Sequence, residues 1–194
     1  EVTVKILPAP EKTRTVLISC TDAATAIGAM TRALSSPHDV SAAAWLPAPA
    51  AARSGVTYVS AANEALAAIR VEGIGASVDA RCASLRDELS AIGGIEELHS
   101  HNSVRLWDEI RDVRLLGGDL EKGDDAIWRI SVPPASAPDL LGGHALLIRA
   151  RDDQRMVEPV FHPESAGVGR LTRNIKEAFD PGGILNPGRM YDGI

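Results

Sequence analysis

The stretch RTVLISCTDAATAIGAMTRAL (residues 14–34) decides the fold, because it contains a strand, a helix cap and an amphipathic helix in succession. Residues 14–20 are mostly apolar and β-branched, which predicts a strand. Thr21 and Asp22 follow, and short polar side chains of this kind cap the first turn of a helix. The apolar residues beyond them recur at helical spacing and form one face: Ala26, Ile27, Met30, Ala33 and Leu34. A strand leading directly into such a helix predicts helices packed on a sheet.

Strands and helices alternate on both sides of this stretch. Further strands are predicted for EVTVKILP (1–8), for HDVSAAAWLP (38–47), near 69–72 within EALAAIRVEG, and for IEELH (95–99). A long helix is predicted over 76–92. Its buried stripe has spacings of three and four: Val78, Cys82, Leu85, Leu89 and Ile92. The order β-α-β-β-α-β predicts an α+β, ferredoxin-like unit, an antiparallel sheet with both helices on one face.

The second half of the chain begins a similar pattern again. After a short helix (103–113) and an acidic loop, strands are predicted at 126–134 and 144–150, with a helix start at 136–141 between them. A final helix at about 165–178 should turn Val168, Leu171 and Ile175 inward. We therefore predict a ferredoxin-like unit followed by a partial second copy, although the two halves do not align as a sequence repeat.

Composition excludes several classes of function. The 194 residues carry a formal net charge of −6 and contain no basic cluster, which argues against nucleic acid as a partner. No stretch approaches the ~20 apolar residues of a transmembrane helix. Cys20 and Cys82 are the only cysteines and form no metal-binding or redox motif, so we expect two buried free thiols.

Three motifs suggest binding sites, but each has a simpler explanation. His99 and His101 would share one face of a strand, yet they lack a third ligand at useful spacing, so we predict no metal site. The acidic residues within 117–125 do not have the spacing of a calcium loop. The glycines of GIGAS (73–77) lack phosphate-loop spacing and more simply allow close packing of helix and strand. No complete catalytic motif is present, so no catalytic residue is assigned.

One arginine in a predicted strand leaves two interpretations open. In WRISVPP (128–134), Arg129 lies on the face opposite an apolar row. It is either an ordinary surface charge or a clamp that binds a carboxylate through two hydrogen bonds.

The C-terminal sequence FDPGGILNPGRM (179–190) is shaped by proline and glycine. Pro187 and Gly188 fit the two central positions of a type II turn, which would hold Asn186 and Arg189 in fixed directions. Upstream, Pro181 disfavours helical geometry at Asp180 and ends the last helix. Such a turn suits either a structural plug or contact with a polar cofactor.

The string AFDPGGILNPGRM (178–190) resembles the C-terminal signature of FAD-linked oxidases of the vanillyl-alcohol oxidase/p-cresol methylhydroxylase superfamily. The N-terminal EVTVKILPAP resembles the strand that enters the cap, or substrate, domain of that family. SAAAWLP, RVEG, LWDEIRDV and WRISVPP are most similar to the FAD-binding E-type subunit of bacterial glycolate oxidase. The resemblance thus extends along most of the chain.

This resemblance implies that the chain is the cap portion of a longer flavoprotein. Residues 1–178 would form the cap domain, and residues 179–194 a tail that folds back toward an FAD-binding domain absent from this sequence. Asn186 and Arg189 would then face the cofactor. Arg129 is the first candidate for binding the carboxylate of a 2-hydroxy acid substrate, and Arg111 the second.

The resemblance also implies partners and a location. It implies FAD as cofactor, a flavin-binding paralogue and an iron–sulfur subunit as partners, and a cytoplasmic location, peripheral at the inner membrane through those subunits. The Glu–His pair of the family's hydroxy-acid oxidising members is absent, so a partner subunit could perform the oxidation. The alternative is a non-catalytic ferredoxin-like module for subunit assembly or small-ligand binding.

Overall fold

The computed structural model describes residues 9–116, 126–131, 144–150, 159–161, 163–188 and 190–191. The chain divides into two compact units, Glu1–Leu116 and Gly117–Ile194, which are described separately below. The predicted division into a cap domain (1–178) and a tail (179–194) is a division by function, whereas these two units are defined by compactness. The predicted division therefore stays a prediction. The predicted strand at residues 1–8 lies outside the described residues.

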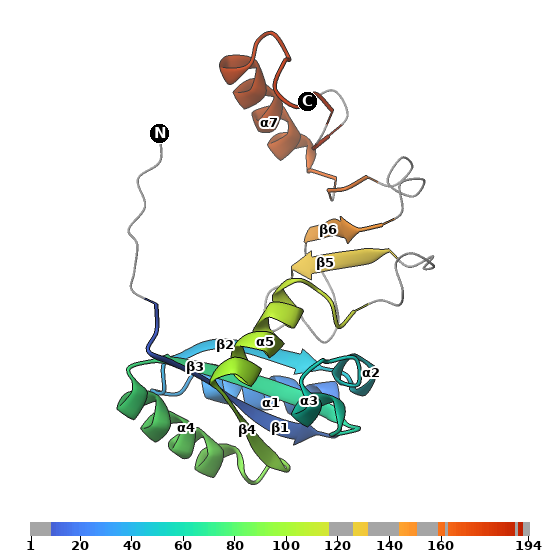
Figure 1. Cartoon of the computed structure of the whole chain (residues 1–194). Coiled ribbons are helices and arrows are strands. Elements are labelled where there is room, and N and C mark those ends of the chain that lie inside the picture. Colours follow the sequence, from blue (N-terminus) through green and yellow to red (C-terminus); the bar gives the residue numbers. More distant parts are fainter. Residues whose placement is uncertain are drawn as a thin grey trace. The chain divides into compact units, whose positions relative to one another are not determined.

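The first unit is built on a four-stranded antiparallel sheet with the strand order β2-β3-β1-β4 (Figure 1). Its elements follow in this order: β1 (Lys12–Cys20), α1 (Ala23–Leu34), β2 (Val40–Leu46), α2 (Ala48–Ala51), α3 (Thr57–Ser60), β3 (Ala65–Gly73), α4 (Gly75–Leu89), β4 (Ile95–His99) and α5 (Ser100–Arg111). The predicted β-α-β-β-α-β order is confirmed, and the strand order is that of a ferredoxin-like fold.

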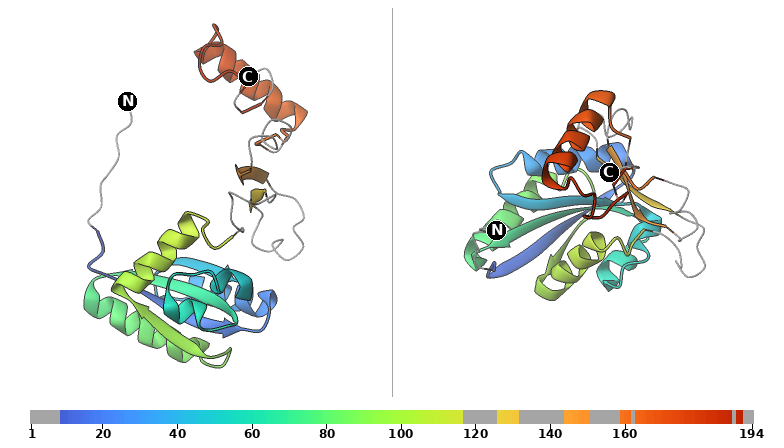
Figure 2. Two further views of the ribbon diagram at one scale, coloured as in Figure 1. Left: turned by 45° about the vertical axis from the view of Figure 1, so that its right-hand side comes forward. Right: turned by 90° about the horizontal axis from the view of Figure 1, so that it is seen from above.

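Helices cover both faces of this sheet (Figure 2). On one face, α1 and α4 pack on Val16, Ile18 and Ile69 through the predicted helical stripes. Leu34 of the predicted α1 stripe is an exception, because it is 56% exposed. On the other face, α2, α3 and α5 pack on Leu17 and Ala68. The sequence did not predict α2 and α3, because each helix has only four residues and is too short to show a helical apolar stripe. Small and aliphatic side chains fill both layers, as the low aromatic content requires.

Local chemistry explains where the elements begin and end. Asp22 caps α1 by accepting a hydrogen bond from the backbone N–H of Thr25 at 2.8 Å, as predicted. Helix α4 ends at Leu89, three residues earlier than expected. After it, the chain passes so close to β1 that a Cβ at Gly93 would collide with the carbonyl oxygen of Ser19. Gly93 is therefore needed for this close approach of the backbone.

The second unit contains a two-stranded antiparallel sheet, β5 (Ile127–Ser131) with β6 (His144–Arg149), and the helix α7 (Ala166–Phe179). The two strands and the helix were predicted, while the helix start at 136–141 and the acidic loop lie outside the described residues. The predicted inward orientation of Val168, Leu171 and Ile175 is wrong, because all three are exposed. The helix is amphipathic, but no described residue covers its apolar stripe. Whether this unit is a second copy stays a prediction.

Candidate functional site

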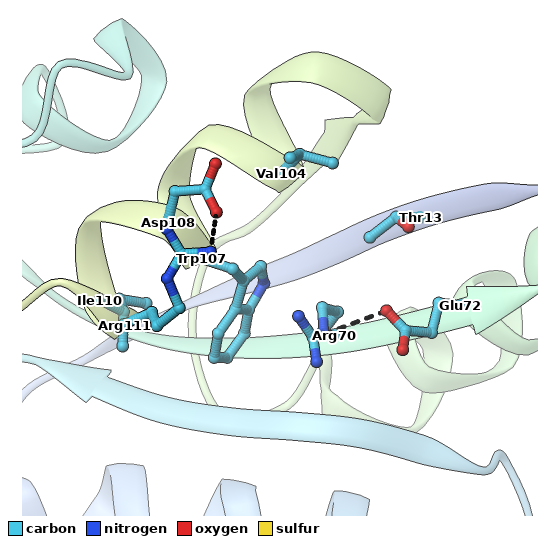
Figure 3. Close-up of a pocket in the computed structure, with 8 residues that line it drawn as sticks. All are labelled: Thr13, Arg70, Glu72, Val104, Trp107, Asp108, Ile110 and Arg111. Atoms are coloured by element: carbon cyan, nitrogen blue, oxygen red, sulfur yellow. Dashed lines mark ion pairs between the residues drawn. The ribbon is translucent and has the colours of Figure 1, made fainter. Parts of the chain in front are cut away.

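A groove of about 400 Å³ lies beside α5 in the first unit (Figure 3). It opens on the sheet face that α5 only partly covers. Helix α5 contributes Val104, Trp107, Asp108, Ile110 and Arg111, and the strands contribute Thr13, Arg70 and Glu72. Grooves that combine an aromatic wall with a few polar groups are typical small-molecule sites.

Trp107 forms the aromatic wall of this groove and is fixed by a buried network. Its indole Nε1 donates a hydrogen bond to Thr15 Oγ1 at 2.9 Å. Thr15 in turn shares a 2.7 Å hydrogen bond with Ser103, and both residues are fully buried. Since each buried polar group is satisfied, the network holds the ring in one orientation.

Arg70 on β3 places a positively charged guanidinium in the same groove, beside Trp107. It lies directly opposite Thr15 in the strand pairing, so its side chain projects on the side of the sheet where Trp107 lies. The guanidinium carbon is 5.0 Å from the centre of the Trp107 ring, a cation–π distance. Arg70 Nε donates to Ser41 Oγ at 3.0 Å and is 3.3 Å from a carboxylate oxygen of Glu72. Among the described residues, neither terminal nitrogen of Arg70 has a hydrogen-bond acceptor.

Arg111, a predicted carboxylate binder, also lines the groove, but its charge is already paired. Its Nη1 is 2.9 Å from Asp108, and its Nε is 2.8 Å from Asp112. The hydrogen bond to Asp112 is the main reason why the pKa of Arg111 is raised. An added carboxylate would have to compete with both acidic partners, so Arg111 is less suited to this role than Arg70.

Arg129, the first predicted carboxylate binder, belongs to the second unit. It pairs with Leu146 across the two-stranded sheet and its side chain is exposed. Both interpretations of Arg129 therefore remain open, and its role in substrate binding stays a prediction.

Two of the three motifs that we explained without a ligand lie in the described residues, and the acidic segment 117–125 lies outside them. The backbone N–H of Gly75, at the start of α4, donates to the carboxylate of Glu11 at 3.2 Å, so a side chain of the chain itself occupies this helix start. His99 ends β4 and His101 lies on α5, so the two do not share a strand face as predicted. No group of three or more potential metal ligands occurs in the described part of the chain.

The C-terminal hook, residues 179–188, is organised by Asp180. This residue is only 6% exposed, and its carboxylate accepts hydrogen bonds from the backbone N–H groups of Ile184, at 3.1 Å, and Leu185, at 2.8 Å. Lys176 on α7 is 2.6 Å from the same carboxylate and also donates to the Leu185 carbonyl. The ion pair with Lys176, and then the Leu185 N–H, lower the pKa of Asp180. The hook is therefore fixed to the end of α7 by polar contacts.

Beyond Asp180, the hook presents its outer turn to solvent. Gly188 has a φ of +66°, the positive value that the predicted type II turn requires. Asn186 is exposed and also has a positive φ, +47°. Arg189, the other predicted cofactor contact, lies outside the described residues.

Apolar side chains are exposed along α7 and the hook. Phe179 is 84% exposed. The other exposed apolar side chains are Val168, Leu171, Ile175, Ile184, Leu185 and, just beyond the hook, Met190. So many large apolar side chains in one short segment are typical of a surface that another protein part covers.

Sequence reasoning missed Arg70, Trp107 and the role of Asp180. A signal for Arg70 was present, since Arg70 and Glu72 follow the apolar Leu66 and Ala68 on the same face of the strand. Trp107 fits a helical core position equally well, so its pattern alone does not distinguish a groove from a core.

Comparison with known proteins identifies the C-terminal segment. Residues 164–190, which comprise α7 and the hook, match the family described as FAD linked oxidases, C-terminal domain. No curated protein matches the chain. The family match supports an FAD-linked oxidase C-terminal domain at this end of the chain, and with it a flavin-dependent oxidoreductase in general. No helix among the described residues is both long and apolar enough to cross a membrane.

Proposed function

We propose that this chain is the C-terminal part of a flavin-dependent oxidoreductase subunit of the glycolate oxidase type, which oxidises a 2-hydroxy acid to a 2-oxo acid. The match of residues 164–190 carries this proposal. The structure of the hook supports it, because a turn that is fixed internally by Asp180 keeps its outer residues available for a neighbour.

The hook fits one edge of an FAD site rather than a whole site. Asn186 offers an amide, and Gly188 leaves the backbone open to close approach because it has no side chain. A glycine-rich phosphate loop is not found in the described residues, so most of the cofactor contacts would come from a separate domain. The chemistry that FAD supplies when bound is acceptance of a hydride from the α-carbon of the acid.

In this proposal, the residues of the chain position the cofactor and the substrate and shield them from water. Asn186 would donate a hydrogen bond to a polar edge of the cofactor. The exposed apolar side chains of α7 and the hook would pack on the flavin-binding domain and exclude water there. Arg129 and Arg111 remain candidates for binding the substrate carboxylate.

The same proposal includes partners and a location. A flavin-binding paralogue and an iron–sulfur subunit would receive the electrons, in a complex that is cytoplasmic and peripheral at the inner membrane. This is tested by co-purification of the three subunits from membrane and soluble fractions.

Flavin content is the direct test of the hook. In the longer protein that carries the flavin domain, Asn186→Ala should lower the amount of flavin bound per polypeptide, while Asn174→Ala, an exposed residue on α7, should not. The present chain alone should bind no flavin. Full flavin occupancy and turnover in Asn186→Ala would contradict the proposed role of the hook.

The second candidate function is a non-catalytic module for subunit assembly or small-ligand binding. It is favoured by the apolar surface of α7, which needs only a protein partner. In that case, Asn186→Ala would leave flavin content unchanged, and Leu171→Ser would disrupt assembly.

A further inference from the structure

We infer that the groove beside α5 binds a small organic monocarboxylate with an apolar body, through the Arg70 guanidinium and the Trp107 indole. The inference concerns the first unit alone. It does not depend on flavin or on the proposed oxidase activity.

The state of Arg70 argues for an anionic ligand. Its Nε is held by Ser41 and Glu72, and its guanidinium carbon lies 5.0 Å from the centre of the Trp107 ring. Within the described residues, the two terminal nitrogens are left without acceptors, and Figure 3 shows this end of the side chain directed toward the Trp107 side of the groove. A planar fork with two open donors matches the two oxygens of a carboxylate. Little side-chain entropy remains to be lost on binding, since the fork is already held in place.

The charges around the groove favour one negative charge rather than several. Glu72 and Asp108 both line it, and Arg111 is paired with Asp108 and Asp112. Among the described residues that line the groove, Arg70 is therefore the arginine with no acceptor at either terminal nitrogen. One carboxylate would be neutralised there, whereas a polyphosphate would meet the acidic side chains.

The remaining lining argues for an apolar body. Trp107, Val104 and Ile110 give the wall an apolar surface opposite the strands, and Val104 is 47% exposed. The volume of about 400 Å³ is within the range of small-molecule sites and is far more than a two-carbon acid fills. A branched acid of about six carbons would place its chain on these residues with its carboxylate at Arg70.

The test uses the flavin-free 194-residue chain and 4-methylpentanoate as the probe. Binding is followed by calorimetry and by the indole N–H signal of Trp107 in ¹H–¹⁵N spectra, which is identified by its loss in Trp107→Phe. We expect a Kd of about 1 mM, as is typical of a ligand of this size. Arg70→Met should weaken binding at least tenfold, because it removes the charge-assisted hydrogen bonds. Arg70→Lys should retain part of the affinity, and the exposed Arg32→Met should leave it unchanged.

Two matched ligands test separately the role of Arg70 in binding the charge and the role of the apolar wall in binding the body of the ligand. 4-Methylpentanamide keeps the apolar body without the charge, and acetate keeps the charge without the body, so both should bind at least tenfold more weakly. Equal binding of the amide, or unchanged affinity in Arg70→Met, would overturn the role of Arg70. Equal binding of acetate would overturn the role of the apolar wall, and absence of saturable binding would overturn the site itself. None of these results depends on the flavin content that tests the hook.

Discussion

Glu109 joins α5 to the loop between α2 and α3, and its removal should destabilise the first unit strongly. The residue is 7% exposed although it is ionisable. Its Oε2 accepts a hydrogen bond from Ser54 Oγ at 2.6 Å, and its Oε1 accepts one from the Gly55 N–H at 3.0 Å. Arg105 lies one turn away, 3.6 Å from Oε1, but is half exposed. The carboxylate thus connects α5 to this loop through two hydrogen bonds.

The magnitude follows from these contacts. Hydrogen bonds to a charged group contribute about 1.5–3 kcal/mol each, but Gly55 is exposed and water can replace its partner in Glu109→Ala. Ser54 is buried and would keep an unmet donor, so we expect a total loss of about 3 kcal/mol in the free energy of unfolding. Glu109→Gln keeps the shape and one acceptor and should lose about 1–2 kcal/mol. The exposed pair with Arg105 should contribute under about 0.5 kcal/mol.

Urea unfolding of the full chain is the assay, in a Trp128→Phe background. The remaining tryptophans, Trp45 and Trp107, both lie in the first unit, so their fluorescence reports on that unit. With slopes of about 1–3 kcal/mol per M, Glu109→Ala should lower the midpoint by about 1–3 M. Arg105→Met is the matched control and should move it little. A midpoint for Glu109→Ala close to that of the background protein would refute this reasoning, as would an equal loss in Arg105→Met.

Three further predictions test other parts of the structure. Gly93→Ala should lower the free energy of unfolding by at least about 2 kcal/mol, because the added Cβ would collide with the Ser19 carbonyl. Gly28→Ala should raise it by up to about 1 kcal/mol, because Gly28 lies in α1 with open space around it. Thermal denaturation of the two variants compares these effects. Burial raises the pKa of the Cys82 thiol to about 11, so it should resist a thiol reagent at pH 8 in the native chain and react once urea is added. Asp180→Asn should speed amide hydrogen exchange in the hook several-fold at pH 7. Because the folded pKa of Asp180 lies below its usual value of 3.8, the carboxylate stabilises the hook at neutral pH, and this difference should vanish as the pH falls through the lower, folded pKa.

The sequence was sufficient for the ferredoxin-like order because its elements are strongly periodic. The stripe of α4 and the capped start of α1 are local signals, and both were predicted correctly. The strand β3 was predicted only near 69–72, since EALAAI favours a helix by composition. In the structure, β3 begins at Ala65 and pairs with the whole length of β1, so tertiary pairing overrides local preference here.

The candidate sites were less predictable, for a physical reason. The groove brings together Arg70 and Trp107 from distant parts of the sequence, and only the register that places Arg70 opposite Thr15 makes them neighbours. The turn at Pro187–Gly188 is local, and its positive φ could be predicted from residue type alone. The exposed stripe of α7 was predicted to point inward because periodicity reveals an apolar face but not what covers it.

The hook illustrates how a short sequence can determine a local shape. Within DPGGIL, Asp180 accepts hydrogen bonds from the backbone N–H groups four and five residues ahead of it. Gly183, which has a positive φ, lies between Asp180 and these two donors. Such spacing is needed only if the turn must keep one shape while its outer residues remain exposed. Phe179 and Ile184 in this turn are both more than four-fifths exposed. The internal polar contacts therefore fix the shape of the hook, while its large apolar side chains stay exposed.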